Sequence, residues 1–339
     1  MTSKTNKDSN ADSELKNALT KINKKFGDGT VYKFSDGDGL PTEYISTGSI
    51  ALDDILDGGV IKGRMVEIFG PESSGKSTTA LHIMAEAQRM GMKAAYVDGE
   101  HTFDPVYATE IGVNVDEMFY VEVDNLEDSL EITRQLAEAG MFIVYDSTNS
   151  LPLRAETDED SNVGDHHVGR EGKIFSQASR MINSLIAKHG ATVIWLSQLR
   201  ANIGGFGNAP KNVVGRGNAL KYYVTTRISC RRTGSGKEQG RKVSNLVKLV
   251  VVKNKKGIQF AETNVEIVYG KGYNKTGEII DIAVEHNLVK KAGAWFKLLD
   301  DDAVILASGQ GKINFAADLE EKPEILEQLR LSVIEKMNE

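Results

Sequence analysis

The chain has 339 residues, 40% apolar and 26% charged, with a formal net charge of −7. This profile is typical of a globular protein of about two domains and excludes a disordered or fibrous chain. No apolar run approaches the ~18 residues of a membrane span, and the polar N-terminus lacks the apolar core of an export signal, so we expect a cytoplasmic protein with no membrane partner. The single cysteine, Cys230, excludes an intramolecular disulfide and a multi-cysteine zinc site.

The N-terminal region divides into a polar tail and a short amphipathic helix. Residues 1–12 are polar and lack periodicity, which indicates a mobile tail. From Glu14 to Phe26 apolar residues recur at helical spacing, and Gly27 follows as a helix stop. The apolar positions are Leu15, Leu19, Ile22 and Phe26. We expect this stripe to pack either on the chain's own core or on a neighbouring subunit.

Between Gly63 and Leu199 the pattern alternates strand with helix, which predicts a parallel sheet covered by helices on both faces. The predicted strands are residues 65–69, 93–97, 141–145 and 192–196. The predicted helices are residues 76–90, 126–139 and 172–189. The chain is therefore expected to be an α/β protein with a mostly parallel central sheet.

The pattern changes after residue 223. Residues 224–231, 246–253 and 264–269 are β-rich and have no helix between them, which predicts antiparallel strands added to one edge of the sheet. After Gly272 a small α/β unit follows and ends in a helix near residues 323–337. We therefore expect three parts: an N-terminal tail and helix, an α/β core, and a small C-terminal domain. Their boundaries are residues 1–34, 35–272 and 273–339.

A phosphate-binding motif of the form G-x4-G-K-[ST] lies between the first apolar strand of this region and the helix that follows it. It consists of Gly70, Pro71, Glu72, Ser73, Ser74, Gly75, Lys76 and Ser77, with Thr78 next to it. Backbone N–H groups of such a loop surround phosphate oxygens, and the helix N-terminus adds favourable partial charge. Lys76 is expected to reach the β- and γ-phosphates of ATP, and the hydroxyl of Ser77 to bind Mg²⁺.

Three further polar residues follow apolar strands of the predicted sheet. Asp146 ends a strand in the manner of a Walker B motif and is predicted to hold Mg²⁺ through water, although a strand-terminal Asp can also be only a helix cap. Glu100 and Gln198 come just after two other strands, so both can lie at the carboxyl edge of the sheet, where ligand chemistry gathers. Glu100 could activate water or be a surface carboxylate, and Gln198 could contact the γ-phosphate.

Charge is segregated along the chain. From Leu199 to Lys256, 14 residues are Lys or Arg and only Glu238 is acidic, which leaves the remainder at −20. Such a run is often only a solvated face. It opens, however, with the glycine-rich segment 204–208, in which Phe206 is the one aromatic residue. Flexible, basic segments with an aromatic ring suit the binding of a nucleic-acid strand.

Several motifs together resemble one known family. Besides the phosphate loop they are Thr47–Ser49, Asp98–His101, Asp104–Pro105, Gly217–Lys221, Val252–Lys255 and Lys291–Trp295. In type and order they resemble the bacterial RecA recombinase family, from about Leu15 to the C-terminal helix. Motifs this numerous are highly specific.

The resemblance implies a P-loop ATPase core, an N-terminal polymerisation helix that packs on the adjacent subunit, and ATP with Mg²⁺ as cofactors. It implies a DNA-dependent ATPase that forms filaments on single-stranded DNA and exchanges strands with homologous double-stranded DNA in recombination and repair. By the same resemblance, Glu100 activates water and Gln198 senses the γ-phosphate. Tyr107 and Tyr269 flank adenine, Asp104 faces its amino edge, and Lys253 and Lys255 reach the neighbouring protomer's ATP.

The resemblance also implies two DNA-facing loops, residues 156–169 and 199–214, with Phe206 as a wedge in the base stack. Further expected DNA contacts are Lys173, Arg180, Arg200, Lys211 and Arg227. Lys173 stands where the family has an arginine, which keeps the charge but loses the planar fork. Some relatives also promote cleavage of a repressor, so a repressor is a possible partner.

Three other functions remain open at this point. A P-loop phosphotransferase acting on a small molecule would need an arginine-rich lid, which the sequence does not supply. A hexameric ring helicase or clock-type ATPase could use the same core, and electron microscopy of rings against filaments would distinguish it. A non-enzymatic DNA-binding filament would not release phosphate. Cys230, Trp195 and Trp295 are interpreted as packing residues.

Overall fold

The computed structural model describes residues 5–27, 31, 42–157, 169–201, 212–214, 220–238, 240–300 and 302–339. The chain separates into two compact units, Met1–Glu43 and Tyr44–Glu339. Within the described ranges, no helix combines the length and apolar character needed to cross a membrane.

The first unit contains the helix α1 (Thr5–Phe26). Its start corrects the expectation of a mobile tail over residues 1–12, because the helix already includes Thr5. Once a helical turn has formed, each added residue gains one backbone hydrogen bond, so polar residues can extend a helix beyond its apolar stripe. Of that stripe, Leu15 and Phe26 are 51% and 65% exposed. These two members of the stripe are therefore exposed.

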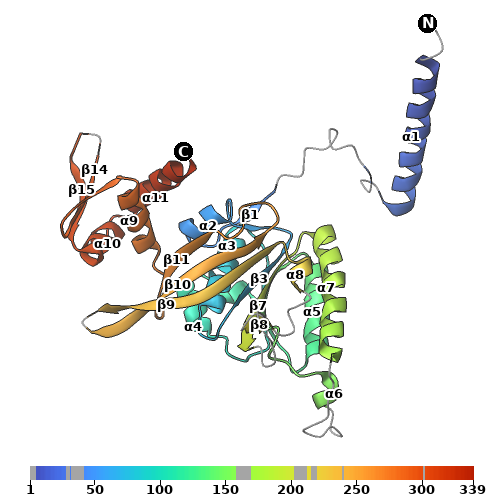
Figure 1. Cartoon of the computed structure of the whole chain (residues 1–339), viewed down its shortest axis with the longest axis horizontal. Coiled ribbons are helices and arrows are strands. Elements are labelled where there is room, and N and C mark those ends of the chain that lie inside the picture. The colour runs from blue at the N-terminus through green and yellow to red at the C-terminus, as the bar shows by residue number, and fades with distance from the viewer. Residues whose placement is uncertain are drawn as a thin grey trace, which may run out of the picture. The chain divides into compact units, whose positions relative to one another are not determined.

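A large sheet forms the centre of the second unit (Figure 1). Its strands are β3 (Met65–Gly70), β4 (Ala94–Asp98), β5 (Phe119–Glu122), β6 (Phe142–Asp146), β7 (Thr192–Ala201), β8 (Asn212–Val214), β9 (Thr226–Glu238), β10 (Arg241–Asn254), β11 (Glu262–Val268) and β12 (Gly272–Tyr273). The described order is β12-β11-β10-β9-β3-β7-β6-β4-β5, and β8 pairs with β7. β5, β4, β6, β7 and β3 are parallel, which confirms the predicted α/β class.

Helices cover both faces of this sheet, and each face has its own hydrophobic core (Figure 1). One core lies under α2 (Ile50–Ile55), α3 (Lys76–Arg89) and α4 (Pro105–Ile111). The other lies under α5 (Leu126–Glu138) and α7 (Arg170–His189). Successive strand residues point to opposite faces, so Val66 and Ile68 join the first core and Met65 joins the second. Shorter elements are β1 (Tyr44–Ile45), β2 (Val60–Ile61), η1 (Val115–Glu117), α6 (Arg154–Thr157) and α8 (Leu220–Tyr223).

The β-rich region after residue 223 differs in one respect from its prediction. β10, β11 and β12 are antiparallel to their neighbours, as predicted, but β9 pairs with β3 in parallel. The chain between β8 and β9 includes α8, and a helical connection lets two strands run in the same direction. The parallel part of the sheet therefore extends one strand further than the alternation of strand and helix indicated.

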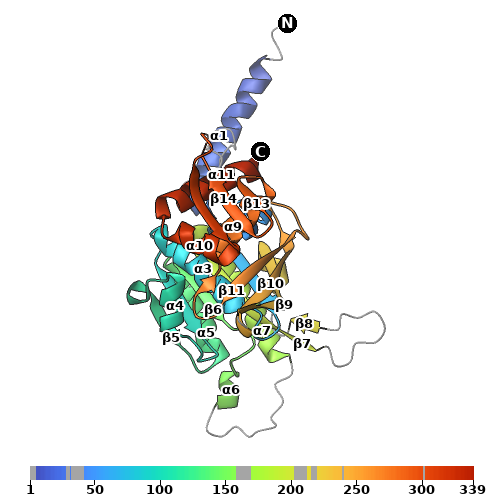
Figure 2. The same cartoon turned by 90° about the vertical axis from the view of Figure 1, so that its left-hand side faces the viewer.

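The C-terminal segment has a hydrophobic core of its own, which includes Ile280, Phe296, Phe315 and Val333. Figure 2 shows its elements grouped together. They are α9 (Lys275–Glu285), β13 (Val289–Ala292), β14 (Trp295–Leu299), β15 (Ile305–Gln310), α10 (Lys312–Glu320) and α11 (Pro323–Asn338). Trp295, interpreted as a packing residue, is 49% exposed because β14 alternates and Trp295 lies on its outer face.

Tyr145 interrupts the aliphatic run of β6, and the structure explains it. Its ring packs against fully buried Trp195 with the centroids 4.9 Å apart. Its hydroxyl lies 2.7 Å from the hydroxyl of Ser129 on α5. A polar group at this depth is tolerated because it is hydrogen-bonded. Tyr145 therefore ties the sheet to the helix that covers it.

Replacing Tyr145 with Phe should lower the free energy of unfolding by about 1 kcal/mol, because a single buried hydrogen bond is lost while the ring packing stays. Urea denaturation measures this change. ATP turnover should not change, because the side chain of Tyr145 lies on the α5 face of β6, whereas the carboxylate of the next residue, Asp146, lies on the opposite face beside Ser77 of α3. A loss of turnover without a loss of stability would contradict this interpretation.

Candidate nucleotide and DNA site

The phosphate loop joins β3 to α3 in a tight turn. Ser73 and Gly75 have positive φ angles of 52° and 92°. A Cβ on Gly70 would lie 2.2 Å from the carbonyl oxygen of Cys230, so only glycine fits there. A Cβ on Gly75 would lie 2.5 Å from Cδ1 of Ile267. Close packing, as well as the turn, therefore requires the glycines of the motif.

Polar groups of this loop fit a phosphate. α3 begins at Lys76, so free N–H groups and the positive end of the helix dipole lie at the loop. The Lys76 ammonium is held by the carbonyl oxygen of Pro71 at 2.9 Å. The hydroxyl of Ser74 is buried and has no hydrogen-bond partner within the described residues. Leaving a buried hydroxyl unpaired costs free energy, and a phosphate oxygen would supply its partner.

Ser77 and Asp146, the residues predicted to hold magnesium, lie in contact. Asp146 is 3% exposed and accepts hydrogen bonds from the Ser77 hydroxyl at 2.8 Å and from the Tyr96 hydroxyl at 2.7 Å. Burial raises the pKa of Asp146 to about 6, and these two hydrogen bonds offset part of the rise. Elsewhere in the described ranges no three His, Cys, Asp or Glu residues could together hold a metal ion. One carboxylate and one hydroxyl, completed by phosphate oxygens and water, suit Mg²⁺.

Glu100 and Gln198 are brought together from separate strand ends. The Gln198 amide donates a hydrogen bond to Oε1 of Glu100 at 2.5 Å. The hydroxyl of Ser147, the residue after Asp146, donates to the same oxygen at 2.5 Å. Glu100 is only partly buried. The arrangement can therefore present a carboxylate to a water molecule while holding it in one orientation.

The sequence analysis gave Asp98 no role beyond its place in the motif Asp98–His101. Its carboxylate accepts hydrogen bonds at 2.8–3.0 Å from the backbone N–H groups of Glu100, His101, Thr102 and Phe103. It is 1% exposed, at the end of β4. These bonds hold the turn that carries Glu100. A strand-terminal Asp followed by glycine was the available signal, because Asp side chains often bond to backbone a few residues on.

A separate hollow of about 470 Å³ adjoins the phosphate loop. Its lining includes Asp104, Tyr107, Tyr269, Ser73 and Thr78. The Tyr107 hydroxyl lies 2.9 Å from that of Thr78 on α3. The Asp104 carboxylate also caps α4, because it accepts from the N–H groups of the two residues after Pro105. The residues predicted to surround adenine thus share one hollow beside the loop.

Lys253 and Lys255 lie at the end of β10. The Lys253 ammonium donates a hydrogen bond to the carbonyl oxygen of Lys221 on α8 at 2.5 Å, and the Lys255 side chain is exposed. Burial, Lys255 and Arg227 together lower the pKa of Lys253. No contact within the described residues joins Lys253 to Asp146 or Glu100 of its own chain.

Comparison with known proteins identifies the family. Residues 13–274 match the model of the RecA N-terminal domain. Residues 277–338 match that of the RecA C-terminal domain. The chain belongs to the RecA family. It is 40% identical to Protein RecA of Rubrobacter xylanophilus, covering 95% of this chain and 92% of that one. It is 41% identical to Protein RecA of Frankia alni, covering 96% and 93%.

The RecA fold is seen in solved structures as well. A crystal structure of the RadB recombinase matches 68% of this chain and 98% of that chain, with a TM-score of 0.51 and 21% identity. At this level of identity the similarity concerns the fold alone. The chain thus has the RecA-like core and small C-terminal domain that its motifs predicted.

RecA membership assigns the chain to DNA recombination and repair, as a filament-forming recombinase with DNA-dependent ATPase activity. Membership excludes two of the alternatives considered above, the phosphotransferase acting on a small molecule and the non-enzymatic DNA-binding filament. It also favours a filament over a hexameric ring. Membership supports two kinds of partner, DNA and further copies of the same chain.

Some of the DNA contacts predicted from the RecA resemblance lie on described residues. Lys173 and Arg180 on α7 line one open hollow, together with Tyr223 of α8. Arg227 instead forms an ion pair with buried Glu67, with Nε and Oε2 2.5 Å apart, and its side chain is only 16% exposed. This geometry does not support a phosphate contact by Arg227. The Arg200 side chain, Phe206, Lys211 and most of the two predicted loops lie outside the described residues.

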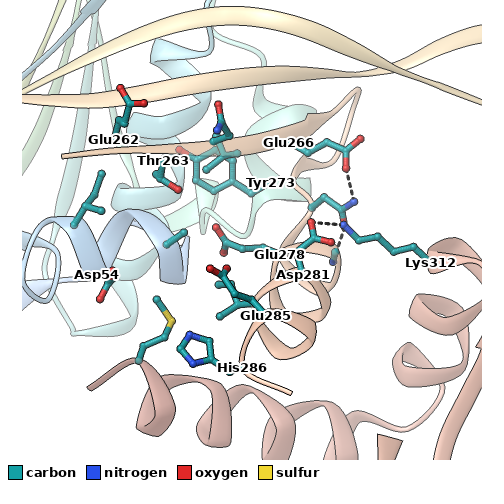
Figure 3. Close-up of a pocket in the computed structure, with 18 residues that line it drawn as sticks. Asp54, Glu262, Thr263, Glu266, Tyr273, Glu278, Asp281, Glu285, His286 and Lys312 are labelled. Carbon is teal, nitrogen blue, oxygen red and sulfur yellow. Dashed lines mark hydrogen bonds and ion pairs between the residues drawn. The ribbon is translucent and has the colours of Figure 1, made fainter. Parts of the chain in front are cut away.

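A larger hollow lies between β11, α2 and α9, as Figure 3 shows. Its volume is about 610 Å³, and most of the charged residues that line it are acidic. The acidic residues are Asp54, Glu262, Glu266, Glu278, Asp281 and Glu285. Lys312 lies on its rim and is paired with Asp281 at 2.6 Å. Like charges repel, so this hollow is unsuited to phosphate.

The raised pKa of Asp146 predicts that the free energy of unfolding depends on pH. Its folded-state pKa of about 6 lies above its usual 3.8, so the folded chain binds this proton more tightly than the unfolded chain does. Its contribution to stability is therefore full below about pH 4 and is lost as pH rises through about 6. Asp146→Asn should stabilise the nucleotide-free protein at pH 7.5, by up to about 3 kcal/mol.

Urea denaturation at pH 7.5 and pH 4.5 measures this effect, and the gain should shrink at the lower pH. The same variant should bind Mg-ATP more weakly, because the carboxylate is the charged group at the magnesium position. An equal gain at both pH values would show that the titration of Asp146 is not its cause.

Proposed function

We propose that this chain binds Mg-ATP at the phosphate loop, polymerises on single-stranded DNA, pairs it with homologous double-stranded DNA and exchanges strands. The observation that carries the proposal is the contact between Glu100 and Gln198. It joins a candidate water-activating carboxylate to the strand β7, which continues into the predicted DNA-binding loop. One hydrogen bond thereby connects the carboxylate that would activate water to the strand that leads to the predicted DNA-binding loop.

Each residue of the nucleotide site has a distinct role in this proposal. Lys76 and the N-terminus of α3 bind the β- and γ-phosphates, and Ser77 and Asp146 hold Mg²⁺. The bound ion neutralises charge on the phosphate oxygens. Tyr107 and Tyr269 would flank the base in the hollow beside the loop.

Hydrolysis requires a water molecule oriented towards the γ-phosphate. Glu100 accepts a proton from that water, because its carboxylate is partly exposed and held in place by Ser147. Gln198 leaves Glu100 to contact the γ-phosphate when ATP is bound, which moves the end of β7. An amide that exchanges one partner for another can report the state of the nucleotide at a distance.

The neighbouring protomer completes the site. Lys253 and Lys255 of one protomer would stabilise the negative charge that develops on the next protomer's ATP, as an arginine finger does. Hydrolysis then depends on assembly, because no protomer holds a complete site. DNA stimulates hydrolysis because it assembles the protomers in register.

Glu100→Gln should form filaments on single-stranded DNA but hydrolyse ATP at least about 100-fold more slowly, the usual contribution of a general base. Phosphate release and electron microscopy measure the two properties. The matched control is Glu122→Gln, because Glu122 stands beside Asp98 in the register of the adjacent strand β5. A control variant as slow as Glu100→Gln would assign the loss to charge at the sheet edge rather than to a base.

Lys173→Ala/Arg180→Ala should weaken binding to single-stranded DNA and reduce the slope of log K against log salt by roughly 1–2, because each phosphate contact releases counterions. Fluorescence anisotropy over a salt series measures the slope. Lys188→Ala, at the other end of α7, is the control and should leave the slope unchanged. An unchanged slope in the double variant would remove these residues from the DNA contact surface.

A further inference from the structure

A row of three charged residues crosses neighbouring strands of the sheet. Glu67 on β3 is in register with Arg227 on β9, and Arg227 is in register with Lys253 on β10. Residues in register on adjacent strands lie side by side on one face of the sheet. The row thus links the strand that enters the phosphate loop to one of the two lysines that we assign to the neighbouring protomer's ATP.

Within the row, Arg227 is paired with Glu67, whereas the Lys253 ammonium is bonded to a different part of the chain. Glu67 is fully buried and binds Nε of Arg227 at 2.5 Å. The Arg227 guanidinium also lies over the ring of Phe69, 4.6 Å from its centroid, on the same strand as Glu67. Arg227 is therefore drawn towards β3. The Lys253 ammonium instead binds the carbonyl oxygen of Lys221 on α8.

A β-bulge accounts for the position of Lys253. The register of β10 shifts between Val251 and Lys253, so the chain gains one residue against β9 at this point. Bulges turn side chains in a new direction and are common beside functional sites. Without the shift, the residue opposite Arg227 would be Val252. The bulge therefore places a lysine beside an arginine, an arrangement that like charges oppose.

Glu67 offsets that repulsion. The nearby charges of Arg227 and Lys253 both lower the pKa of Glu67, against the stronger effect of burial. Removing one partner of a buried ion pair leaves the other uncompensated. Without the Glu67 carboxylate, Arg227 would lose its ion-pair partner on β3, and its uncompensated charge would act more strongly on the Lys253 ammonium beside it.

We propose that Glu67 is a positioning residue for Lys253: by holding Arg227 against β3, it leaves the Lys253 ammonium able to exchange the carbonyl oxygen of Lys221 for the ATP of the neighbouring protomer. This inference rests on the proposed function, in which Lys253 and Lys255 act across the subunit junction. Because Glu67 stands three positions before Gly70 in the chain, it also joins a protomer's own phosphate loop to the lysine that serves the next site. Adjacent nucleotide sites along a filament are thereby mechanically linked.

Mixed filaments test whether Glu67 acts through the lysines or through its own phosphate loop. Glu67→Gln alone should reduce DNA-dependent turnover at least about tenfold, with KM for ATP changed by less than about threefold, because the transition state loses a cation while ground-state binding remains. A Glu100→Gln protomer keeps Lys253 and Lys255 but lacks the base. A Lys253→Gln/Lys255→Gln protomer keeps its phosphate loop and its base but lacks the two lysines.

Glu67→Gln mixed 1:1 with Glu100→Gln should recover turnover of about one quarter of wild type, because about one junction in four then joins a protomer that has Glu100 to a neighbour whose lysines are correctly placed, in a head-to-tail assembly. Glu67→Gln mixed with Lys253→Gln/Lys255→Gln should recover none. The reverse pattern would overturn the inference, because it would place the defect of Glu67→Gln in its own phosphate loop. Recovery in both mixtures or in neither would overturn it too.

The proposed function has its own control in the same experiment. Lys253→Gln/Lys255→Gln mixed with Glu100→Gln should recover about one quarter of wild-type turnover, by the same head-to-tail arithmetic. Failure of this mixture would overturn the shared site itself. If this mixture recovers turnover and the mixture of Glu67→Gln with Glu100→Gln does not, only the role of Glu67 is overturned.

Two further variants separate positioning from folding. Adding Arg227→Gln to Glu67→Gln removes the uncompensated charge beside Lys253, so it should restore at least about threefold of the lost turnover, since neighbouring sites couple. No restoration would contradict the positioning role. If Glu67→Gln does not fold, Glu67→Asp keeps the charge but withdraws it by one methylene, and it should show the same mixing pattern. The exposed pair Glu131–Arg134 on α5 supplies the control: Glu131→Gln should leave turnover unchanged.

Discussion

The hydrogen bond between Glu100 and Gln198 depends on the order of the parallel strands. β4, β6 and β7 are neighbours in the sheet, so the residues that follow their carboxyl ends meet at one edge. β3 lies next to β7 and delivers the phosphate loop to that edge. A catalytic carboxylate, a magnesium position and a nucleotide-sensing amide therefore converge without any of them being close in sequence. The sheet provides the rigid support that such a site requires.

Burial gives this edge its electrostatic character. Asp98 and Asp146 are almost fully buried, and each is held by hydrogen bonds from nearby donors. Glu67 is buried just below the phosphate loop and is paired with Arg227. Charges in a low-dielectric setting interact strongly with one another and with a bound phosphate. The same burial raises the pKa of Asp146, so the nucleotide-free protein gives up some stability near neutral pH to keep a carboxylate available.

Strands β3, β4, β6 and β7 and helices α3, α5 and α7 could be predicted from apolar runs and helical spacing, but α2 and α4 were not predicted. The phosphate loop and Asp146 could be predicted from local motifs. β5 was missed because it is only four residues long and its side chains are mostly exposed. The role of Asp98 was missed because four of its five hydrogen bonds come from backbone N–H groups, which no side-chain motif displays. Arg227 was assigned to DNA because its partner, Glu67, lies 160 residues away in sequence. Sequence patterns and composition do not show which residues far apart in the chain lie in contact.

The coupling between nucleotide and DNA is tested most directly by the affinity for single-stranded DNA in two nucleotide states. Wild-type protein should bind the strand more tightly with a slowly hydrolysed ATP analogue than with ADP. Gln198→Ala should bind both nucleotides but lose most of that difference, because the link between Glu100 and β7 is gone. A variant that retains the full difference would contradict the coupling through Gln198.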